Sequence, residues 1–381
     1  MPRGLPVAAI ARAMRVLEQL PAIDSTDELD QRIAFLFLRR EAVESSRMEG
    51  TWSTMDHVLT PGELYDENEG RTERASVLGY AHALEAELKT SIPVGVRSLT
   101  PTLVCRLHRE VMSRDPGYQG RAGKIRRPGR PGEIVFIGGT RRREDAVYNP
   151  TPPRHVERCL TEVMEWLSDD ELAALGDAGM GIPLPVRLAL GHSHFEAVHP
   201  FSDGNGRVGR MIMSLQMAYT GRIPLYLSGF IEAEKRDYIR ALESGQKKLN
   251  YGPMVEFICD AISASHREAQ ITRKLILSLP DDWRARGQFR QGSAADRSLA
   301  LLLGRPILTA KMLQDSLEVS PVAAQRAISQ LRDAGILRER TGFKRNRVFA
   351  AEEVIQILSR RFGEDPSLAL EHARDLIGRP R

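Results

Sequence analysis

The chain has 381 residues, which is enough for two or three domains that each bury a core. Its hydrophobic content of 42% and charged content of 27% are those of an ordinary soluble globular protein, and no apolar run approaches the length that spans a membrane. Cys105, Cys159 and Cys259 are far apart and odd in number, which argues against a disulfide framework and against zinc-ligand spacing. We therefore expect a cytoplasmic protein without a membrane partner.

The positive charges are concentrated in two stretches. The net charge is only +4, but Arg121–Arg143 holds eight Lys or Arg against the single acid Glu133, and Arg305–Val348 holds nine against four. Because clustered cations attract anions more strongly than a diffuse excess does, these stretches indicate an acidic partner.

Helical periodicity dominates the sequence up to Ser263. The N-terminus mixes apolar and basic residues as a weak signal peptide does, but its arginines interrupt the apolar stretch, and we interpret it as a helix. Further helices are expected at Leu29–Arg47, Ala75–Leu88, Leu103–Met112, His155–Leu167, Leu184–Ala197, Val208–Tyr219, Glu232–Gln246 and Met254–Ser263.

The pattern changes between Arg121 and Pro153, where Gly, Pro and Arg surround a short β-type run, Ile134-Val135-Phe136-Ile137. Such a run, bounded by turn residues, predicts a small hairpin or flap and not a core element.

A polar, Gly-containing segment, Asp281–Asp296, is the best candidate for a domain boundary. We accordingly divide the chain into N-terminal helices (1–95), a central core (96–275), a linker (276–300) and a C-terminal module (301–381).

The C-terminal module begins with a predicted helix over Leu308–Leu317. Ser320 is a natural N-cap and Pro321 suits the first helical position, so a second helix is predicted over Val322–Ala334. Its expected core side carries Ala323, Ala327, Ile328 and Leu331. A basic wing, Arg338–Val348, follows, and the whole resembles a winged helix-turn-helix.

Two interpretations of this module stay open. If it binds DNA, then Gln325, Arg326, Ser329 and Arg332 are the side chains that face a major groove. Alternatively, residues 301–381 form a dimerisation or target-docking module.

The most informative stretch is His199-Pro-Phe-Ser-Asp-Gly-Asn-Gly-Arg-Val-Gly-Arg210. The imidazole of His199 is able to take a proton from a hydroxyl near neutral pH. The carboxylate of Asp203 is the kind of ligand that holds Mg²⁺ against phosphate oxygens.

The rest of this stretch suits an anion. Gly204 and Gly206 let backbone N–H groups approach it without a Cβ in the way, and Arg207 and Arg210 supply planar, charged forks that match phosphate oxygens. An apolar helical segment, Met211–Tyr219, follows, so the loop is expected at a helix N-terminus, where the dipole favours anions.

These twelve residues match every fixed position of His-x-Phe-x-Asp/Glu-Gly-Asn-Gly-Arg-x-x-Arg, including Phe201. The chain thereby resembles the Fic (Fido) family over roughly residues 30–350. The resemblance implies a mostly α protein, a Fic-type helical bundle with a small β-hairpin flap, followed here by a C-terminal winged-helix domain. It also implies transfer of AMP from ATP, with Mg²⁺, to a Ser, Thr or Tyr hydroxyl of a target protein.

The resemblance assigns a role to each residue of the signature. It makes His199 the general base and Asp203 the Mg²⁺ ligand. The nucleotide-binding residues are then Gly204, Asn205, Gly206, Arg207, Gly209 and Arg210. Within this set Arg207 is expected on the β-phosphate and Arg210 on the γ-phosphate.

Other parts of the nucleotide site are less sharply marked. Tyr238 and Gln246 lie eight residues apart, on one face of the expected helix, and in the family such residues border the adenine. His192 and His194 precede the signature with a spacing that suggests a metal site together with His199, but no Cys or Asp completes it, and we expect helix-face roles for them.

Upstream, Ser45-Ser46-Arg47-Met48-Glu49-Gly50 matches the inhibitory motif of the family, Ser/Thr-x-x-x-Glu-Gly/Asn. The resemblance implies that Glu49 pairs with Arg210 and takes it from the γ-phosphate. We expect this pair to be bidentate and partly desolvated. In some relatives the same glutamate helps a water to remove AMP from a modified target.

The flap also resembles the family, in which it holds the target segment by strand addition. This makes Ile134, Val135, Phe136 and Ile137 the target-docking residues. The expected partners are a target protein with an exposed hydroxyl and the chain itself, through auto-AMPylation. The family's frequent dimers add a homodimer to these expectations.

Several alternatives remain at the level of sequence. The signature reads phosphates better than bases, so another donor, such as UTP or CDP-choline, is compatible with it, as is phosphorylation of the target. An alternative of another class is a DNA-binding transcription regulator whose Fic domain only senses nucleotide.

Overall fold

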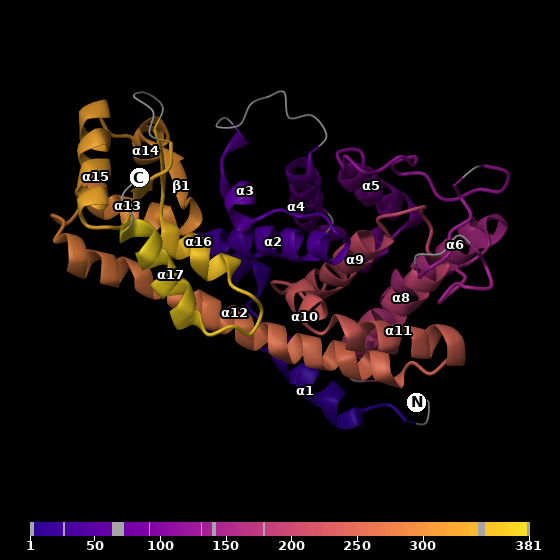
Figure 1. Ribbon diagram of the computed structural model, residues 1–381. Coiled ribbons are helices and arrows are strands. Elements are labelled where there is room, and N and C mark those ends of the chain that lie inside the picture. The colour runs from indigo at the N-terminus through magenta and orange to yellow at the C-terminus, as the bar shows by residue number, and fades with distance from the viewer. Residues whose placement is uncertain are drawn as a thin grey trace. The chain divides into compact units, whose positions relative to one another are not determined.

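The computed structural model describes residues 4–25, 27–62, 72–90, 92–130, 132–138, 142–177, 180–341 and 347–378 (Figure 1). The chain forms two compact units. Unit 1 comprises Met1–Ser25, Glu44–Trp52 and Gly70–His266, and unit 2 comprises Thr26–Val43, Ser53–Glu69 and Arg267–Arg381. These units do not follow the division at residues 95, 275 and 300 expected from the sequence, because two long helices, α2 (Glu28–Met48) and α12 (Gly252–Gly287), supply residues to both.

Unit 1 is a helical assembly. Its helices are α1 (Val7–Glu18), α4 (Glu73–Thr90), α5 (Pro101–Met112), α6 (Val156–Leu167), α7 (Asp170–Asp177), α8 (Leu184–Val198), α9 (Asn205–Ala218), α10 (Ser228–Ala233) and α11 (Lys235–Lys248). Three 3₁₀ turns, Ile23–Ser25, Ile92–Ser98 and Pro153–His155, join them. The helices that periodicity predicts are confirmed, with two differences.

The first difference is a break in the predicted Glu232–Gln246 helix. The backbone of Glu234 leaves helical geometry (φ −104°, ψ 34°), so α10 ends at Ala233 and α11 begins at Lys235. The second is the length of α12. The predicted Met254–Ser263 is only the interior of this 36-residue helix, which continues through Pro280.

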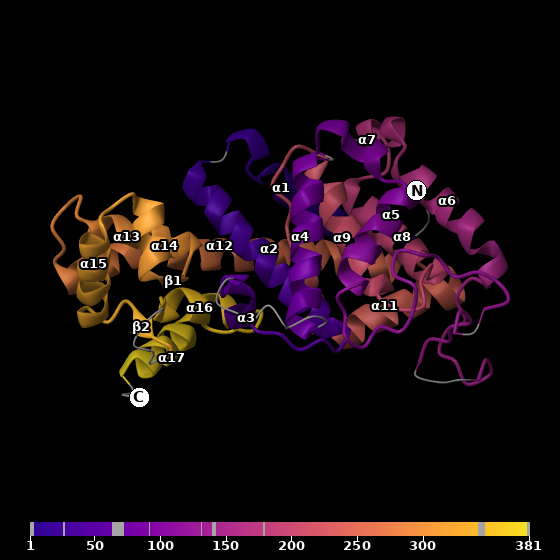
Figure 2. The same ribbon diagram turned by 90° about the horizontal axis from the view of Figure 1, so that it is seen from above.

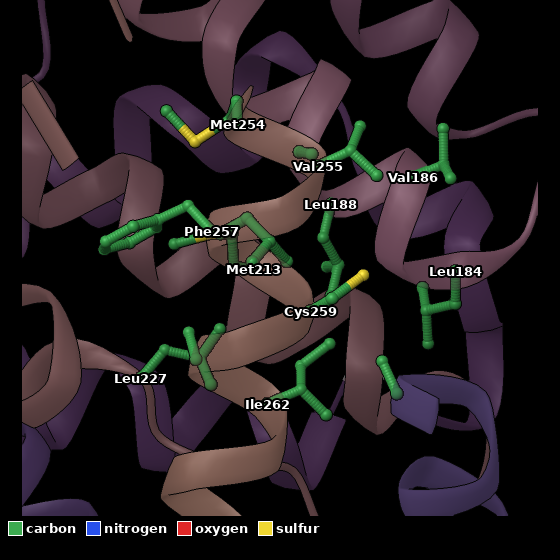
Figure 3. Close-up of a cluster of buried hydrophobic side chains, with 14 of the residues drawn as sticks. Leu184, Val186, Leu188, Met213, Leu227, Met254, Val255, Phe257, Cys259 and Ile262 are labelled. Atoms are coloured by element: carbon green, nitrogen blue, oxygen red, sulfur yellow. The ribbon is translucent and has the colours of Figure 1, made fainter. Parts of the chain in front are cut away.

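The core of unit 1 explains why α8 and α9 are apolar on nearly every side. Side chains from α8, α9 and α12, including Leu188, Met213 and Val255, point toward one another in one buried cluster (Figure 3). Ala13 of α1 completes it and is fully buried. Burial of each large side chain contributes about 2 kcal/mol, so this cluster fixes the two helices that carry the signature.

Unit 2 contains a small antiparallel sheet (Figure 2). Its elements are α3 (Met55–Leu59), α13 (Ala294–Gly304), β1 (Ile307–Thr309), α14 (Ala310–Leu317), α15 (Pro321–Asp333), β2 (Arg338–Glu339), β3 (Val348–Ala350), α16 (Glu352–Ser359) and α17 (Pro366–Gly378). The strand order is β1-β3-β2, with Ile307 and Arg338 both opposite Ala350. The two helices predicted at Leu308–Leu317 and Val322–Ala334 correspond to α14 and α15. The winged-helix assignment itself stays a prediction.

The segment predicted as a linker, 276–300, is largely helical. Residues up to Gly287 continue α12, and α13 begins at Ala294. The segment is helical because Trp283 is fully buried and donates its Nε1–H to Glu353 at 2.5 Å, where Arg286 also pairs. Its polar residues form the exposed side of a helix that is anchored by one aromatic ring.

The turn before α15 is as predicted. The Ser320 hydroxyl accepts from the Ala323 N–H at 3.2 Å, and Pro321 occupies the first turn. The buried side of the helix carries Ala324 instead of the predicted Ala323. Within the predicted wing, residues 342–346 lie outside the described part of the chain.

No helix in the described ranges is both long enough and apolar enough to cross a membrane.

Candidate functional site

The signature forms the loop between α8 and α9, and its first residue has an unusual backbone. His199 ends α8 in the left-handed region (φ 49°, ψ 63°), and its N–H still donates to the carbonyl of Phe195 at 2.9 Å. Because a residue with a Cβ avoids this region, the conformation persists only where neighbours hold it.

Arg126 supplies much of this restraint. The residue is 2% exposed, and its guanidinium donates to the carbonyls of His199 (2.8 Å), Thr151 (2.8 Å), Val198 (3.1 Å) and Glu133 (3.2 Å). Burial lowers the pKa of Arg126 to about 10, so the group remains a cation at neutral pH. Arg126 lies in the basic stretch Arg121–Arg143, and the structure shows that its side chain braces the turn at His199.

The side chains of Asn205 and His108 hold the interior of the loop together. Asn205 forms two hydrogen bonds of 2.9 Å with the backbone of Phe201, so its side chain organises the loop. His108 stacks on Phe201 at 3.7 Å and bonds through Nε2 to the Asp203 carbonyl at 3.0 Å, while its Nδ1 accepts from the Gly123 N–H at 2.8 Å. Burial lowers the pKa of His108 to about 4, which keeps the ring neutral.

Gly204 and Gly206 lie at the N-terminus of α9, as predicted. Gly204 caps the helix with φ 78°, and a Cβ there would lie 2.6 Å from the Met112 sulfur. The N–H of Gly204 donates to Oδ1 of Asp203 at 2.6 Å, which fixes the direction of an otherwise exposed carboxylate. One exposed carboxylate beside a helix N-terminus fits a Mg²⁺ ion that takes most of its remaining ligands from phosphate and water.

The inhibitory motif reaches the same helix. Arg210 is 2% exposed, and its guanidinium donates to the Ser45 hydroxyl (2.8 Å), the Ser45 carbonyl (2.9 Å) and Oε1 of Glu49 (2.7 Å). The predicted pairing of Glu49 with Arg210 is therefore present in the structure. The bidentate geometry that we expected is not: Glu49 receives one bond of the fork, because the Ser45 carbonyl takes another.

The end of α2 is held in place by several contacts. Gly50 leaves the helix with φ 83°, and its N–H donates to the Arg47 carbonyl at 3.0 Å. Arg47 pairs with Glu232 at 3.2 Å, and Lys235 donates to the Met48 carbonyl at 3.1 Å. These contacts fix the turn that carries Glu49.

The carboxylate of Glu49 lies against the glycines of the signature. A Cβ built on Gly206 would overlap Oε1 of Glu49 and lie 2.9 Å from Nη1 of Arg210. The motif therefore places its negative charge at the N-terminus of α9, the position where backbone N–H groups and the helix dipole attract an anion.

Arg207 has different partners from those of Arg210. It is 2% exposed, and its Nη1 pairs with Asp115 at 2.8 Å and bonds to the Ser76 hydroxyl at 3.1 Å. Burial opposes ionisation of Asp115, but the hydrogen bond and charge of Arg207 outweigh it and lower the pKa of that carboxyl. In this conformation Arg207 ties α9 to the turn after α5, and its contact with a β-phosphate stays a prediction.

Gly209 and Tyr238 lie in the interior. A Cβ on Gly209 would lie 3.0 Å from Nδ1 of His192 and 3.1 Å from Oε1 of Glu196, so this glycine allows close packing of α8 and α9. Tyr238 is 5% exposed and bonds to Nε2 of His192 at 2.7 Å. Gln246 is half-buried on the same helix. Tyr238 is therefore a core residue in this structure. That Tyr238 and Gln246 border the adenine remains a prediction.

The predicted hairpin is reduced to one antiparallel bridge, between Ile137 and Tyr148. Ile134 is 68% exposed, and none of the described residues pairs with the backbone of Ile134, Val135 or Phe136. Of the basic residues expected around this flap, Arg141 lies outside the described residues, as does Gly139 of the motif.

The described cations of the basic wing in unit 2 pair with acids of the same unit. Arg340 pairs with Glu352 at 2.7 Å and also with Asp56, and Arg347 pairs with Glu339 at 3.3 Å. Gln325, Arg326, Ser329 and Arg332 are exposed on α15, as a groove-facing helix requires. The paired wing nevertheless removes much of the charge that motivates DNA binding.

Sequence reasoning missed three partners of the signature. Asp115 sits in a Ser-Arg-Asp-Pro-Gly stretch that indicates only a turn, and its Oδ1 does accept from the Gly117 N–H at 3.0 Å. His108 and Glu196 lie on amphipathic or apolar helices. The sequence offered one indirect signal for such partners. An arginine of the signature that becomes buried needs an anionic partner from another part of the chain.

The fold agrees with comparisons to known proteins. Residues 98–217 match the model of the Fic/DOC family, and residues 7–89 match that of the Fic/DOC family N-terminal region. The chain therefore carries a Fic/DOC domain preceded by a Fic/DOC N-terminal region. A Fic family protein from Desulfovibrio desulfuricans G20 has a similar fold, with a TM-score of 0.51 at 18% identity over 91% of this chain and 95% of that one.

Two curated relatives illustrate the sequence matches. A protein adenylyltransferase, fic-1, of Caenorhabditis briggsae is 29% identical over 171 residues, which are 45% of this chain and 27% of that protein. A probable protein adenylyltransferase of Aquifex aeolicus (strain VF5) is 27% identical over 138 residues, 34% of this chain and 38% of that one. The matches thus span less than half of these relatives.

We predict that Asp115→Asn destabilises unit 1 by about 3 to 5 kcal/mol at pH 7, because it leaves the Arg207 cation buried without its charge partner. The pKa of Asp115 is lowered by folding, so this contribution is complete above the unfolded value near 4 and is lost as the pH falls below it. The difference between the calorimetric melting points of the parent and Asp115→Asn should therefore shrink as the pH falls below about 4, and should vanish only below the lowered pKa of Asp115. Ser76→Ala, which keeps the ion pair, is the matched control; a pH-independent difference for Asp115→Asn would contradict the assignment.

We also predict that Gly204→Ala lowers stability by about 1 to 3 kcal/mol, because the added Cβ meets a positive φ and the Met112 sulfur. The combined variant Gly204→Ala, Met112→Ala separates the two causes, since it relieves the contact and keeps the backbone strain. Thermal melting measures both. Equal stability of Gly204→Ala and the parent would show that the loop relaxes freely.

Proposed function

We propose that the chain transfers AMP from ATP to a hydroxyl side chain of a protein target, itself included, and that Glu49 restrains this activity. The observation that carries the proposal is the contact of Glu49 with both Arg210 and the Gly206 backbone. An acidic side chain there lies on the N-terminus of α9, where a phosphate group would be attracted. The names of the curated relatives support the reaction type.

The proposed reaction uses His199 as the general base. It removes the proton from the attacking hydroxyl, whose oxygen bonds to the α-phosphorus while the bond to the β-phosphate oxygen breaks and pyrophosphate leaves. His199 lies in a loop that Arg126 and Asn205 hold rigid, as a positioned base requires. Bound Mg²⁺, held by Asp203, would neutralise charge on the phosphates.

The proposed restraint is electrostatic competition. Arg210 is buried and already satisfied by Ser45 and Glu49, so a γ-phosphate gains its guanidinium only by displacing the carboxylate. Glu49 is only 27% exposed in its side chain, which makes the pair stronger than a surface salt bridge. Its contact with Gly206 adds a steric element.

The flap suits a protein substrate. The backbone groups of Ile134, Val135 and Phe136 do not pair with the described residues, and an added strand from a target would satisfy them. This mode fixes register through the backbone and places few demands on the sequence of the target.

We predict that Glu49→Gly strongly increases auto-AMPylation, because Arg210 and the α9 N-terminus are released together. Intact-protein mass spectrometry after incubation with ATP and Mg²⁺ measures the added AMP. Ser45→Ala should release the restraint only in part, by about fivefold to tenfold, because it removes one of three bonds to Arg210. The double variant Glu49→Gly, His199→Ala is the control, because it lacks the proposed general base and should not be labelled.

Equal labelling of wild type and Glu49→Gly would refute the restraint. No labelling of any variant with ATP would refute the proposed donor, and the same assay with UTP and CDP-choline would then identify another. Loss of AMP from a pre-labelled chain would instead indicate the reverse reaction.

A further inference from the structure

Glu196 is a buried carboxylate that the proposed mechanism does not use. It lies on α8, three residues before His199, and its side chain is 11% exposed. A buried carboxylate costs several kcal/mol unless charges or hydrogen bonds offset its desolvation. Its retention in the interior beside the signature therefore requires a partner.

The nearest partner is the proposed base. Oε2 of Glu196 lies 3.7 Å from Nδ1 of His199, whose side chain is 14% exposed. This separation is beyond a hydrogen bond and within direct charge interaction, and a small rotation of either side chain would close it. In the described part of the chain, Nδ1 of His199 and Oε1 of Glu196 have no hydrogen-bond partner.

Other groups keep Glu196 ionised and oriented. Burial opposes its ionisation, but the nearby His199, His192 and Arg210 outweigh it and lower the pKa of the carboxyl. His192 is held in turn by its bond to Tyr238, and Gly209 brings α9 within contact of both side chains. The surroundings of Glu196 thus come from α8, α9 and α11.

We propose that Glu196 is a positioning residue for His199: its carboxylate accepts a hydrogen bond from Nδ1–H, so that the unprotonated Nε2 faces the target hydroxyl. The hydrogen bonds of the two imidazole nitrogens decide which of them carries the proton. A carboxylate beside Nδ1 favours the tautomer in which Nδ1 is protonated and Nε2 is free. It also stabilises the imidazolium that forms when His199 takes the proton. The inference rests on the proposed role of His199 as base.

The arrangement explains a feature of the packing. Gly209 occupies a position that the signature leaves variable. A Cβ there would lie only 3.0 Å from the His192 ring and 3.1 Å from Oε1 of Glu196, which is tighter than most packing contacts. Close approach of the two helices brings Arg210, the group that Glu49 restrains, and Glu196, the group that orients the base, into one buried cluster.

The kinetic test compares Glu49→Gly with Glu49→Gly, Glu196→Ala. Since Glu196 acts through His199, we expect kcat to fall on the order of 100-fold while the KM for ATP changes less than about twofold. Glu196→Gln, which keeps the volume and an acceptor oxygen, should lose less and guards against misfolding. His194→Ala, on the exposed side of α8, is the matched control and should retain kcat.

A second readout does not depend on turnover. Ring ¹⁵N signals of histidine-labelled protein, with His199 assigned through His199→Ala, should show protonated Nδ1 in the parent and a shift toward Nε2–H in Glu196→Ala. Unchanged ring signals, or a kcat within about twofold of Glu49→Gly, would overturn the proposal. If Glu49→Gly itself transfers no AMP, the proposed function fails while the ring signals still decide the role of Glu196.

Discussion

The guanidinium of Arg210 is the group on which the site depends. It is buried beneath the α9 N-terminus, where desolvation alone would lower its pKa, but the Glu49 carboxylate outweighs this and raises it. A buried cation needs an anion within reach at all times. In the structure one of the chain's own residues satisfies Arg210. In the proposed function a bound phosphate is the alternative partner, and the competition between the two regulates activity.

The proposed competition depends on the rigid placement of both Glu49 and Arg210. Glu49 ends a helix whose last turn is fixed by Gly50, Arg47 and Lys235, and Arg210 begins its helix behind a loop braced by Arg126 and Asn205. Rigid placement lowers the entropy cost of the ion pair and makes its strength exceed that of exposed pairs. The same bracing holds His199 in a backbone conformation that it would otherwise avoid.

Local patterns predicted much of the fold and the centre of the site. Apolar periodicity located most helices, and the Ser320-Pro321 cap located the start of α15, because both signals depend on neighbouring residues only. The signature and the inhibitory motif were readable for the same reason. The helical structure of the predicted linker was not foreseen, because a polar composition does not distinguish an exposed helical face from a loop. The buried Trp283 also bonds to a residue 70 positions away.

The partners of the buried charges were not predictable. Arg207 reaches Asp115, which is 92 positions away and looks like an ordinary turn residue in the sequence. Glu196 is close to His199 in the sequence, yet an acidic residue on an apolar helix carries no mark of its neighbours until α9 and α11 are packed against it. Long-range packing therefore determines which charges inside the Fic domain bind ligand and which hold the structure together.

The central claim is that Glu49 and a γ-phosphate exclude one another at Arg210. The most direct test is to measure by calorimetry the ratio of ATP to ADP affinity in wild type and in Glu49→Gly, both with His199→Ala to prevent turnover. We expect similar affinities for ATP and ADP when Glu49 is present, because the γ-phosphate then adds little. In Glu49→Gly we expect ATP to bind clearly more tightly than ADP. The same ratio in both proteins would contradict it.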